Sequence, residues 1–384
     1  MKVLVCPSGF KGSVSPDTAA DCIEAGILRA IPAATIRKIP LADGGEGFAH
    51  ALVAATGGSI RKLRIIGPVG APIHSFYGIV GNAPVKMAVV EMAAAAGLSL
   101  VPPACRNPCI TTTFGVGQLI AAALDEGVQK IIIGCGDSGT SDGGAGMLQA
   151  LGARLVGRDG QDLPHAAGGQ SLVSLAGVDL SHMHPRLKTV AIEAVCNWKN
   201  ILCGPQGVAR VYGPQKGATV EQTELLAAAL DTYAVVIQRT LGIKIADAPG
   251  SGASGGLGAG LLLVGAKLRP RYDALMEYFQ LHNIFDECDL VITAEGGVDD
   301  QTPKGKIPAE VAVRARKRGI PVIVLAGTIG RNARVNYEVG IDAFTSILQR
   351  PSTLKEAIGE TEQLLVEAAE GAMRMVGIGR RLGG

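Results

Sequence analysis

Two kinds of hydrophobic pattern alternate along the chain. Short apolar runs rich in β-branched residues predict strands, and longer segments in which apolar residues recur every three or four positions predict helices. Strands are expected at 2–6, 35–39, 130–134, 290–293, 321–325 and 343–346, and helices at 16–30, 115–126, 219–241 and 354–376. This alternation is typical of βα units wound around a mostly parallel sheet. The predicted fold class is therefore α/β.

A different pattern covers residues 60–90, where apolar and polar residues alternate around the turns Gly67-Pro68 and Ala71-Pro72. Such alternation indicates an antiparallel sheet with one solvated face. The stretch 152–194 is also broken by Gly, His and Pro. Because the chain exceeds the roughly 250 to 300 residues over which a single core keeps growing, we expect two domains. The second domain would begin near residue 60 and interrupt the first.

Charge and composition narrow the class of partner. The 36 basic residues nearly balance the 34 acidic ones and are scattered, so the chain lacks the long-range field typical of binders of nucleic acids or anionic membranes. Apolar runs stay shorter than the ~20 residues that span a bilayer, and the stretch after Met1 is too short for a signal peptide. The eight cysteines form no CxxC pair, which favours reduced thiols in the cytoplasm. We expect a cytoplasmic protein with a small-molecule partner.

Candidate chemistry lies in loops that follow the expected strands, where ligands bind in open α/β sheets. The loop PSGFKGS (7–13) places Lys11 and Ser13 directly before a helix, whose free N–H groups favour a phosphate or carboxylate. A plain helix cap by Ser13 or Ser15 is the alternative. The loop LADGGEGF (41–48) holds Asp43 and Glu46 among glycines, and these carboxylates suit Mg²⁺. An Asx turn with a capping Glu46 is the alternative there.

Three glycine-rich segments could meet a nucleotide. GCGDSGTSDGGAG (134–146) matches GxGxxG, but the helix does not open at the third glycine as a dinucleotide site requires. A loop whose amides and Asp142 meet a phosphate or its metal fits the spacing better. GPQGVARVYGPQKGAT (204–219) carries Lys216 before a helix, and PGSGASGGLGAGL (249–261) is nearly free of side chains. The last segment would hold phosphates or, alternatively, allow close packing of backbones.

The loop TAEGGVDDQTPKGKIP (293–308) is the strongest single signal, with acidic and basic residues crowded at a strand end. They are Glu295, Asp299, Asp300, Lys304 and Lys306; a solvated surface loop is the alternative. The chain has no GxxxxGK[ST] and no GxSxG motif, and its six histidines lie outside the glycine-rich loops. Phosphoryl transfer is the reaction class that needs no His or Cys nucleophile, because it depends on positioning, Mg²⁺ and cationic side chains.

Taken in order, these loops resemble the type I glycerate kinase family over nearly the whole chain. The matching segments are FKGS (10–13), LADGGEG (41–47), RNPCITTTFGVGQLI (106–120), SDGGAGMLQALG (141–152), VYGPQKGA (211–218), SGGLGAGL (254–261) and DQTPKGKIP (300–308). The resemblance implies ATP-dependent phosphorylation of D-glycerate with Mg²⁺. It also implies a discontinuous Rossmann-like three-layer domain (1–58, 100–148 and 286–384), an inserted mixed α/β domain (59–99 and 149–285), and an active site in the cleft between them.

The chain departs from the family pattern inside the motif loops. This chain has PSGFKGS where the family has PDSFKGS, GDSGTSDGG where it has GGSATNDGG, CNWKNIL where it has CDVTNPL, and EGGVD where it has EGRLD. The changes introduce Ser8, Asp137, Asn197 and Gly297. Asparagine cannot act as a general base, and loss of an arginine removes a bidentate clamp. Either the substrate differs from glycerate or activity is lost. Retention of the other charged motif residues favours an active enzyme.

Roles are assigned by the resemblance together with the loop chemistry. Predicted catalytic residues are Asp43, Asp142, Asp299 and Lys306; substrate-binding residues are Lys11, Ser13, Arg106 and Asn197; nucleotide-binding residues are Gly136, Ser138, Lys216, Gly252, Gly255 and Gly256; metal ligands are Asp43, Glu46 and Glu295. A kinase of another small hydroxy acid, a non-catalytic nucleotide sensor and an NAD-dependent oxidoreductase are the alternatives. Monomer and homodimer both stay open.

Overall fold

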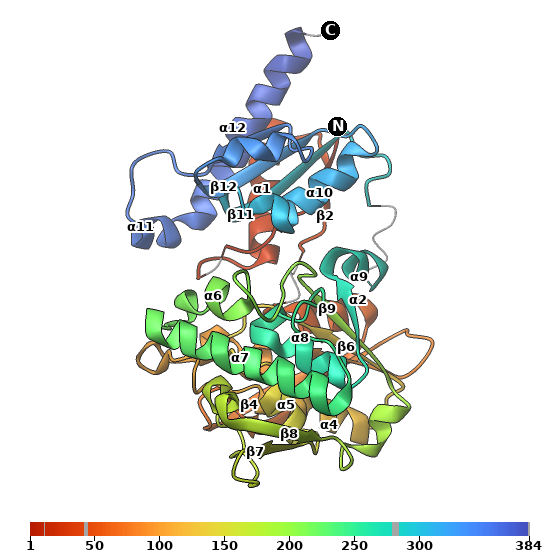
Figure 1. Ribbon diagram of the computed structural model, residues 1–384. Helices are drawn as coiled ribbons and strands as arrows, with labels where there is room; N and C mark the ends of the chain where they lie inside the picture. The colour runs from red at the N-terminus through yellow and green to blue at the C-terminus, as the bar shows by residue number, and fades with distance from the viewer. Residues whose placement is uncertain (11, 42–44, 279–283, 383–384) are drawn as a thin grey trace. The chain divides into compact units, whose positions relative to one another are not determined.

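The computed structural model describes residues 1–10, 12–41, 45–278 and 284–382. The chain divides into two compact units (Figure 1). Unit 1 comprises Met1–Asp43 and Gln280–Gly384, and unit 2 comprises Gly44–Phe279. A discontinuous first unit with an inserted second one was predicted. Within the described residues, no helix is long and apolar enough to cross a membrane.

Unit 1 is built on a five-stranded, wholly parallel sheet. Its strands are β1 (Lys2–Val5), β2 (Thr35–Lys38), β11 (Leu290–Val298), β12 (Val322–Ile329) and β13 (Ala343–Ser346), in the order β13-β12-β11-β1-β2. From β1 the chain adds β2 at one edge of the sheet, and from β11 it adds β12 and β13 toward the opposite edge. This is the 2-1-3-4-5 order of doubly wound folds, with its switch point between β1 and β11. The Rossmann-like prediction for this unit is confirmed.

Helices cover the sheet of unit 1. Helices α1 (Pro16–Ala30) and α12 (Thr361–Leu382) pack against each other on the face that carries Val3, Val5 and Ile292. A Cβ at Gly26 would lie 2.2 Å from a carbonyl oxygen of α12, so only glycine permits this close crossing. Helix α10 (Ile307–Arg316) packs against β11 and β12. The short helix α11 (Leu354–Gly359) precedes α12.

Unit 2 contains a mixed six-stranded sheet. Its strands are β3 (Ser59–Ile66), β4 (Pro72–Val80), β5 (Met87–Glu91), β6 (Lys130–Gly134), β9 (Ala191–Cys196) and β10 (Lys267–Pro270), in the order β10-β9-β6-β5-β4-β3. The pairs from β10 to β5 are parallel, and those of β4 with β5 and β3 are antiparallel. The antiparallel prediction for 60–90 is therefore confirmed. A separate hairpin joins β7 (Arg154–Gly157) and β8 (Leu175–Asp179).

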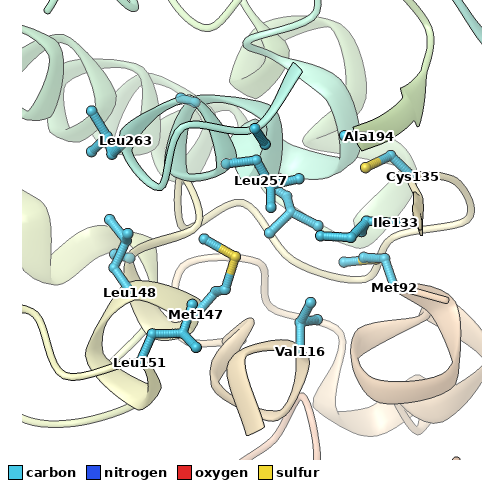
Figure 2. Close-up of a cluster of buried hydrophobic side chains, with 14 of the residues drawn as sticks. Met92, Val116, Ile133, Cys135, Met147, Leu148, Leu151, Ala194, Leu257 and Leu263 are labelled. Carbon is cyan, nitrogen blue, oxygen red and sulfur yellow. The ribbon is translucent and has the colours of Figure 1, made fainter. Parts of the chain in front are cut away.

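The core of unit 2 lies between this sheet and its helices. The helices are α2 (Phe48–Thr56), α3 (Ala93–Ala96), α4 (Phe114–Asp125), α5 (Ala145–Ala150), α6 (Val208–Tyr212), α7 (Val220–Leu241), α8 (Ala253–Leu263) and α9 (Arg271–Tyr278). Figure 2 shows Val116 of α4, Ile133 of β6, Met147 of α5 and Leu257 of α8 meeting in one fully buried cluster. Their contact ties the loops that follow β6 and precede α8 to a rigid base.

The predicted boundaries between the domains were wrong in two places. Residues 44–58 and 100–148 were assigned to the Rossmann-like domain, but they belong to unit 2. The reason is that β6 pairs with β5 and β9, in the centre of the second sheet. A buried parallel strand has the same apolar pattern in either sheet, so the pattern cannot show which sheet it joins.

Candidate active site

In unit 1, the predicted charged loop lies at the switch point of the sheet. The loop follows β11, and the backbone after β1 runs beside it, since Ser8 donates from both its N–H (2.8 Å) and its hydroxyl (2.9 Å) to the Ala294 carbonyl. Ligands of doubly wound sheets bind outside the carboxyl ends of the strands at this point. Lys11, on the loop after β1, lies outside the described residues.

Three of the predicted residues converge here: Glu295 lies near the end of β11, Asp299 directly follows the strand, and Lys306 precedes α10. The Nζ atom of Lys306 donates to the Gly297 carbonyl oxygen at 3.0 Å. It lies 3.4 Å from Asp299 Oδ1 and 3.9 Å from Glu295 Oε1. The three side chains keep 30%, 34% and 22% of their surface exposed. They therefore form a charged group that remains accessible to a ligand.

The backbone around Asp299 is held in a defined shape. Its carboxylate accepts a hydrogen bond from the N–H of Gln301 at 2.9 Å, and its own N–H donates to Thr302 Oγ1 at 3.0 Å. Lys306 is the N-cap residue of α10. The loop thus presents its charged side chains from a fixed turn rather than from a solvated coil.

Ser13 does not face this group through its hydroxyl. The Oγ atom lies 3.0 Å from the Ile358 carbonyl oxygen and 2.7 Å from Thr361 Oγ1, at the junction of α11 and α12. The cap of α1 is Ser15, which accepts from the N–H of Thr18. We conclude that Ser13 fastens its loop to the C-terminal helices, which its substrate-binding assignment did not foresee.

In unit 2, polar residues collect at the carboxyl edge of the parallel strands. Strand β5 ends at Glu91, Asp137 and Ser138 follow β6, Asn197 follows β9, and Arg271 follows β10. The registers Glu91↔Gly134, Gly134↔Val195 and Pro270↔Cys196 align these ends on one edge. The edge combines predicted residues with two that were missed, Glu91 and Arg271. Glu91 is a single charge at the end of the apolar strand β5, which was an available signal, whereas Arg271 follows the basic strand β10 and had no such signal.

Glu91 holds the start of α2. Its side chain is 2% exposed, and its two carboxylate oxygens accept hydrogen bonds from the N–H groups of Gly47 (3.1 Å) and Ala49 (3.0 Å). Burial raises the pKa of Glu91 to about 7, and the negative charges of Glu46 and Asp137 add to the rise. A carboxylate at a helix N-terminus is stabilised by the free N–H groups there. These bonds fix the point where the predicted LADGGEGF loop enters its helix.

Two further contacts fasten the same loop. The N–H of Glu46 donates to Asp137 Oδ2 at 3.2 Å, and the hydroxyl of Ser99 donates to the Glu46 carboxylate. Asp43 lies outside the described residues. Among the described residues, no group of three or more His, Cys, Asp or Glu is arranged to hold a metal ion. The metal-ligand assignment of Asp43, Glu46 and Glu295 stays a prediction.

Asp142 and Lys216 lie beneath the loop 134–146. The Asp142 carboxylate accepts from the N–H and hydroxyl of Thr113 (2.7 and 2.8 Å) and from two further backbone N–H groups. Lys216 Nζ donates to Ser138 Oγ at 2.9 Å and to the Thr140 carbonyl at 2.5 Å. Both side chains are at most 2% exposed, and burial lowers the pKa of Lys216 to about 7. In this conformation they support the loop from beneath.

Three glycines of the segment 249–261 were predicted to bind the nucleotide, and each packs closely against another backbone. A Cβ at Gly255 would lie 1.9 Å from the Thr140 carbonyl oxygen, and one at Gly252 would lie 2.1 Å from that of Ile201. A Cβ at Gly256 would lie 2.7 Å from Gly143 Cα. These contacts fit the alternative, close packing of two backbones, and the nucleotide-binding assignment stays a prediction.

The remaining predicted residues lie at or near the carboxyl edge of unit 2. Gly136 is partly exposed directly after β6. Arg106 has an exposed side chain, and its backbone packs against Gly217, next to Lys216. Asn197 accepts a hydrogen bond from the N–H of Lys199 at 3.1 Å, which shapes the turn after β9.

Comparison with known proteins identifies the family of this chain. The model of the Glycerate kinase family matches residues 3–377. The chain belongs to this family. It is 43% identical to a glycerate kinase of Bacillus subtilis over 370 residues, covering 96% of each chain. It is 40% identical to a protein named glycerate 2-kinase of Escherichia coli over 385 residues, covering both chains fully.

A solved structure agrees with the two-unit α/β fold. The crystal structure of a putative glycerate kinase 2 from Salmonella typhimurium LT2 matches with a TM-score of 0.77 and 42% identity, covering 100% of both chains. As a member of the glycerate kinase family, the protein is a phosphotransferase of the kinase class. This membership argues against the oxidoreductase interpretation of the loop 134–146.

Proposed function

We propose that this glycerate kinase family member transfers the γ-phosphoryl group of ATP to a hydroxyl of D-glycerate in the cytoplasm. The observation that carries the proposal is the accessible group formed by Lys306, Asp299 and Glu295 at the switch point of a parallel sheet. Phosphoryl transfer needs cationic and metal-binding groups in fixed positions rather than a covalent nucleophile. Relatives about 40% identical over their full length carry the name glycerate kinase.

Each residue of the group has a role in the proposed reaction. The acceptor hydroxyl attacks the γ-phosphorus in line, ADP leaves, and the hydroxyl proton passes to a carboxylate, for which Asp299 is our candidate. The Lys306 ammonium would stabilise the negative charge spread over the transferred group. Serine, amide and backbone groups at the carboxyl edge of unit 2 would orient the ligands.

The carboxylates of unit 1 fit a magnesium ion brought with ATP. Mg²⁺ usually takes one or two protein carboxylates together with phosphate oxygens. Glu295 would hold the ion while Asp299 acts as the base; their oxygens lie 3.9 and 3.4 Å from the Lys306 ammonium, so acidic groups face a cation in this loop. When bound, the ion would neutralise phosphate charge. Loss of turnover on chelation, restored by added Mg²⁺, is the expected result.

The hydroxyl at position 2 is our choice of acceptor, because the Escherichia coli relative is named glycerate 2-kinase. The test is ADP release by the full chain with ATP, Mg²⁺ and D-glycerate, followed by ³¹P NMR of the product. A 2-phosphate supports the assignment, and a 3-phosphate contradicts it. Nucleotide binding without ADP release would instead support the sensor alternative.

A larger hydroxy acid is the second candidate acceptor. Trp198 is 41% exposed and directly follows Asn197 at the carboxyl edge of unit 2, where the family pattern has a small residue. A wide apolar ring there could cover additional substrate surface. The same ADP-release assay with larger 2-hydroxy acids separates the two. A kcat/KM at least tenfold higher than that for glycerate would favour this candidate.

A further inference from the structure

Arg271 holds a defined place at the carboxyl edge of unit 2. Strand β10 ends at Pro270, which is in register with Cys196, the last residue of β9. Arg271 therefore begins α9 beside Asn197, and Cys135 lies one strand further along the same edge, since its N–H bonds the Val195 carbonyl. Two residues after Cys135 comes Asp137. The guanidinium thus belongs to the same edge as the loop 134–146.

The positive charge of Arg271 influences two cysteine thiols at the ends of neighbouring strands. Burial raises the pKa of Cys196 to about 11, and the positive charge of Arg271 opposes that rise. The same charge opposes the rise in the pKa of the Cys135 thiol. Arg271 thus acts on the ends of both β6 and β9. Its side chain is partly exposed rather than sealed in the core.

A partly exposed ionic network keeps α9 in place. Glu193, in the middle of β9, pairs with Lys130 of β6 (2.9 Å) and Arg269 of β10 (3.0 Å), and it accepts from the hydroxyl of Tyr278 at the end of α9. Arg269 also pairs with Glu277 of α9 at 2.7 Å. The last turn of α9 is thereby tied to three strands. Its first residue is consequently held at the edge by a rigid helix, as a ligand-binding residue requires.

We propose that Arg271 binds the carboxylate of the acceptor substrate and is a specificity-determining residue of this enzyme. The inference rests on the proposed function, because it takes the acceptor to be a small hydroxy acid. Arginine remains charged at every physiological pH and offers a planar pair of N–H donors that matches a carboxylate. The family motif EGRLD reads EGGVD here, with Gly297 in place of arginine. This loop therefore supplies no guanidinium that could clamp a carboxylate.

The test compares full-length Arg271→Ala, Arg271→Lys and Arg106→Ala with the wild type, measuring kcat and KM for D-glycerate and for ATP. We expect Arg271→Ala to raise the KM for glycerate by about 10- to 100-fold, the usual effect of losing a charged hydrogen bond. The KM for ATP should change less than threefold. Guanidinium ion at a non-denaturing concentration should partly restore Arg271→Ala and leave the wild type unchanged. Lys267→Ala, at the exposed start of β10, is the matched control and should behave as the wild type.

Several outcomes would overturn the inference. An unchanged KM for glycerate in Arg271→Ala, or an effect confined to Arg106→Ala, would place the carboxylate elsewhere. A raised KM for ATP alone would mean that Arg271 meets the nucleotide phosphates. Loss of turnover without rescue by guanidinium, together with a lower unfolding midpoint, would show a structural role. Failure of the proposed function is distinguishable, because in that case the wild type itself would not phosphorylate glycerate.

Discussion

Replacing Glu91 by glutamine removes a buried negative charge and keeps the shape of the side chain. The pKa of Glu91 is raised from 4.5 to about 7 in the folded chain. Between these values the unfolded chain has released its proton while the folded chain still holds it. Stability therefore falls as pH rises from about 4.5 to about 7, by about 3 kcal/mol from this group alone.

Glutamine is neutral, like the protonated form of Glu91, and keeps one acceptor oxygen for the N–H groups of α2. We expect the stability of Glu91→Gln relative to the wild type to rise by about 3 kcal/mol between about pH 4 and about pH 8. The expected effect on turnover at pH 8 is a decrease. At that pH the wild-type carboxylate accepts from both Gly47 and Ala49, and glutamine can satisfy only one of these donors.

Urea unfolding followed by the fluorescence of Trp198 measures this difference, since Trp198 is the single tryptophan of the chain and lies in unit 2. Subtracting the two proteins at each pH cancels the titration of all other groups. Glu221→Gln, on the exposed first turn of α7, is the control and should not reproduce the gain at pH 8. A difference between wild type and Glu91→Gln that is constant from pH 5 to 8 would refute the reasoning.

Three other predictions concern the loops. Lys306→Met should lower kcat about 100- to 1,000-fold at unchanged stability, because the ammonium that stabilises the transferred phosphoryl group is lost. The exposed Lys317→Met should leave kcat unchanged. Steady-state kinetics measures both, and a kcat of Lys306→Met within threefold of the wild type contradicts the assignment. Gly255→Ala should cost about 2 to 5 kcal/mol of unfolding free energy, since its Cβ meets a backbone oxygen and its φ is positive. Gly265→Ala, with a positive φ but open space, should cost only about 1 kcal/mol in the same urea titration, and equal losses would show that packing is not the cause. Ser13→Ala should lower stability by about 1 kcal/mol and change the KM for glycerate less than twofold; a tenfold higher KM would restore its substrate-binding assignment.

The parts of the candidate site that sequence analysis predicted well are local. Glu295, Asp299 and Lys306 lie within eleven positions, between the end of β11 and the start of α10, so a compact turn brings them together. The contact between Glu46 and Asp137, by contrast, spans 91 positions and was not predicted.

The missed or revised residues depend on distant partners. Ser13 meets Thr361, 348 positions away, and its motif contains no sign of that contact. Gly255 faces the carbonyl of Thr140, but a glycine that packs against a backbone and one that admits a ligand have the same letter in the sequence. Glu91 ends the apolar strand β5 and Arg271 follows the basic strand β10, and their neighbours at the edge come from other strands.

The sequence by itself determined the α/β class, the presence of two units, the kinase family and the charged loop after β11, because hydrophobic period and motif order are properties of short segments. Only the tertiary structure decided that β6 belongs to the second sheet, that Asp142 and Lys216 are sealed beneath their loop, and that Glu91 and Arg271 stand at the same edge. Burial and strand pairing are set by the free energy of contacts between residues far apart in the chain. No local pattern records these contacts.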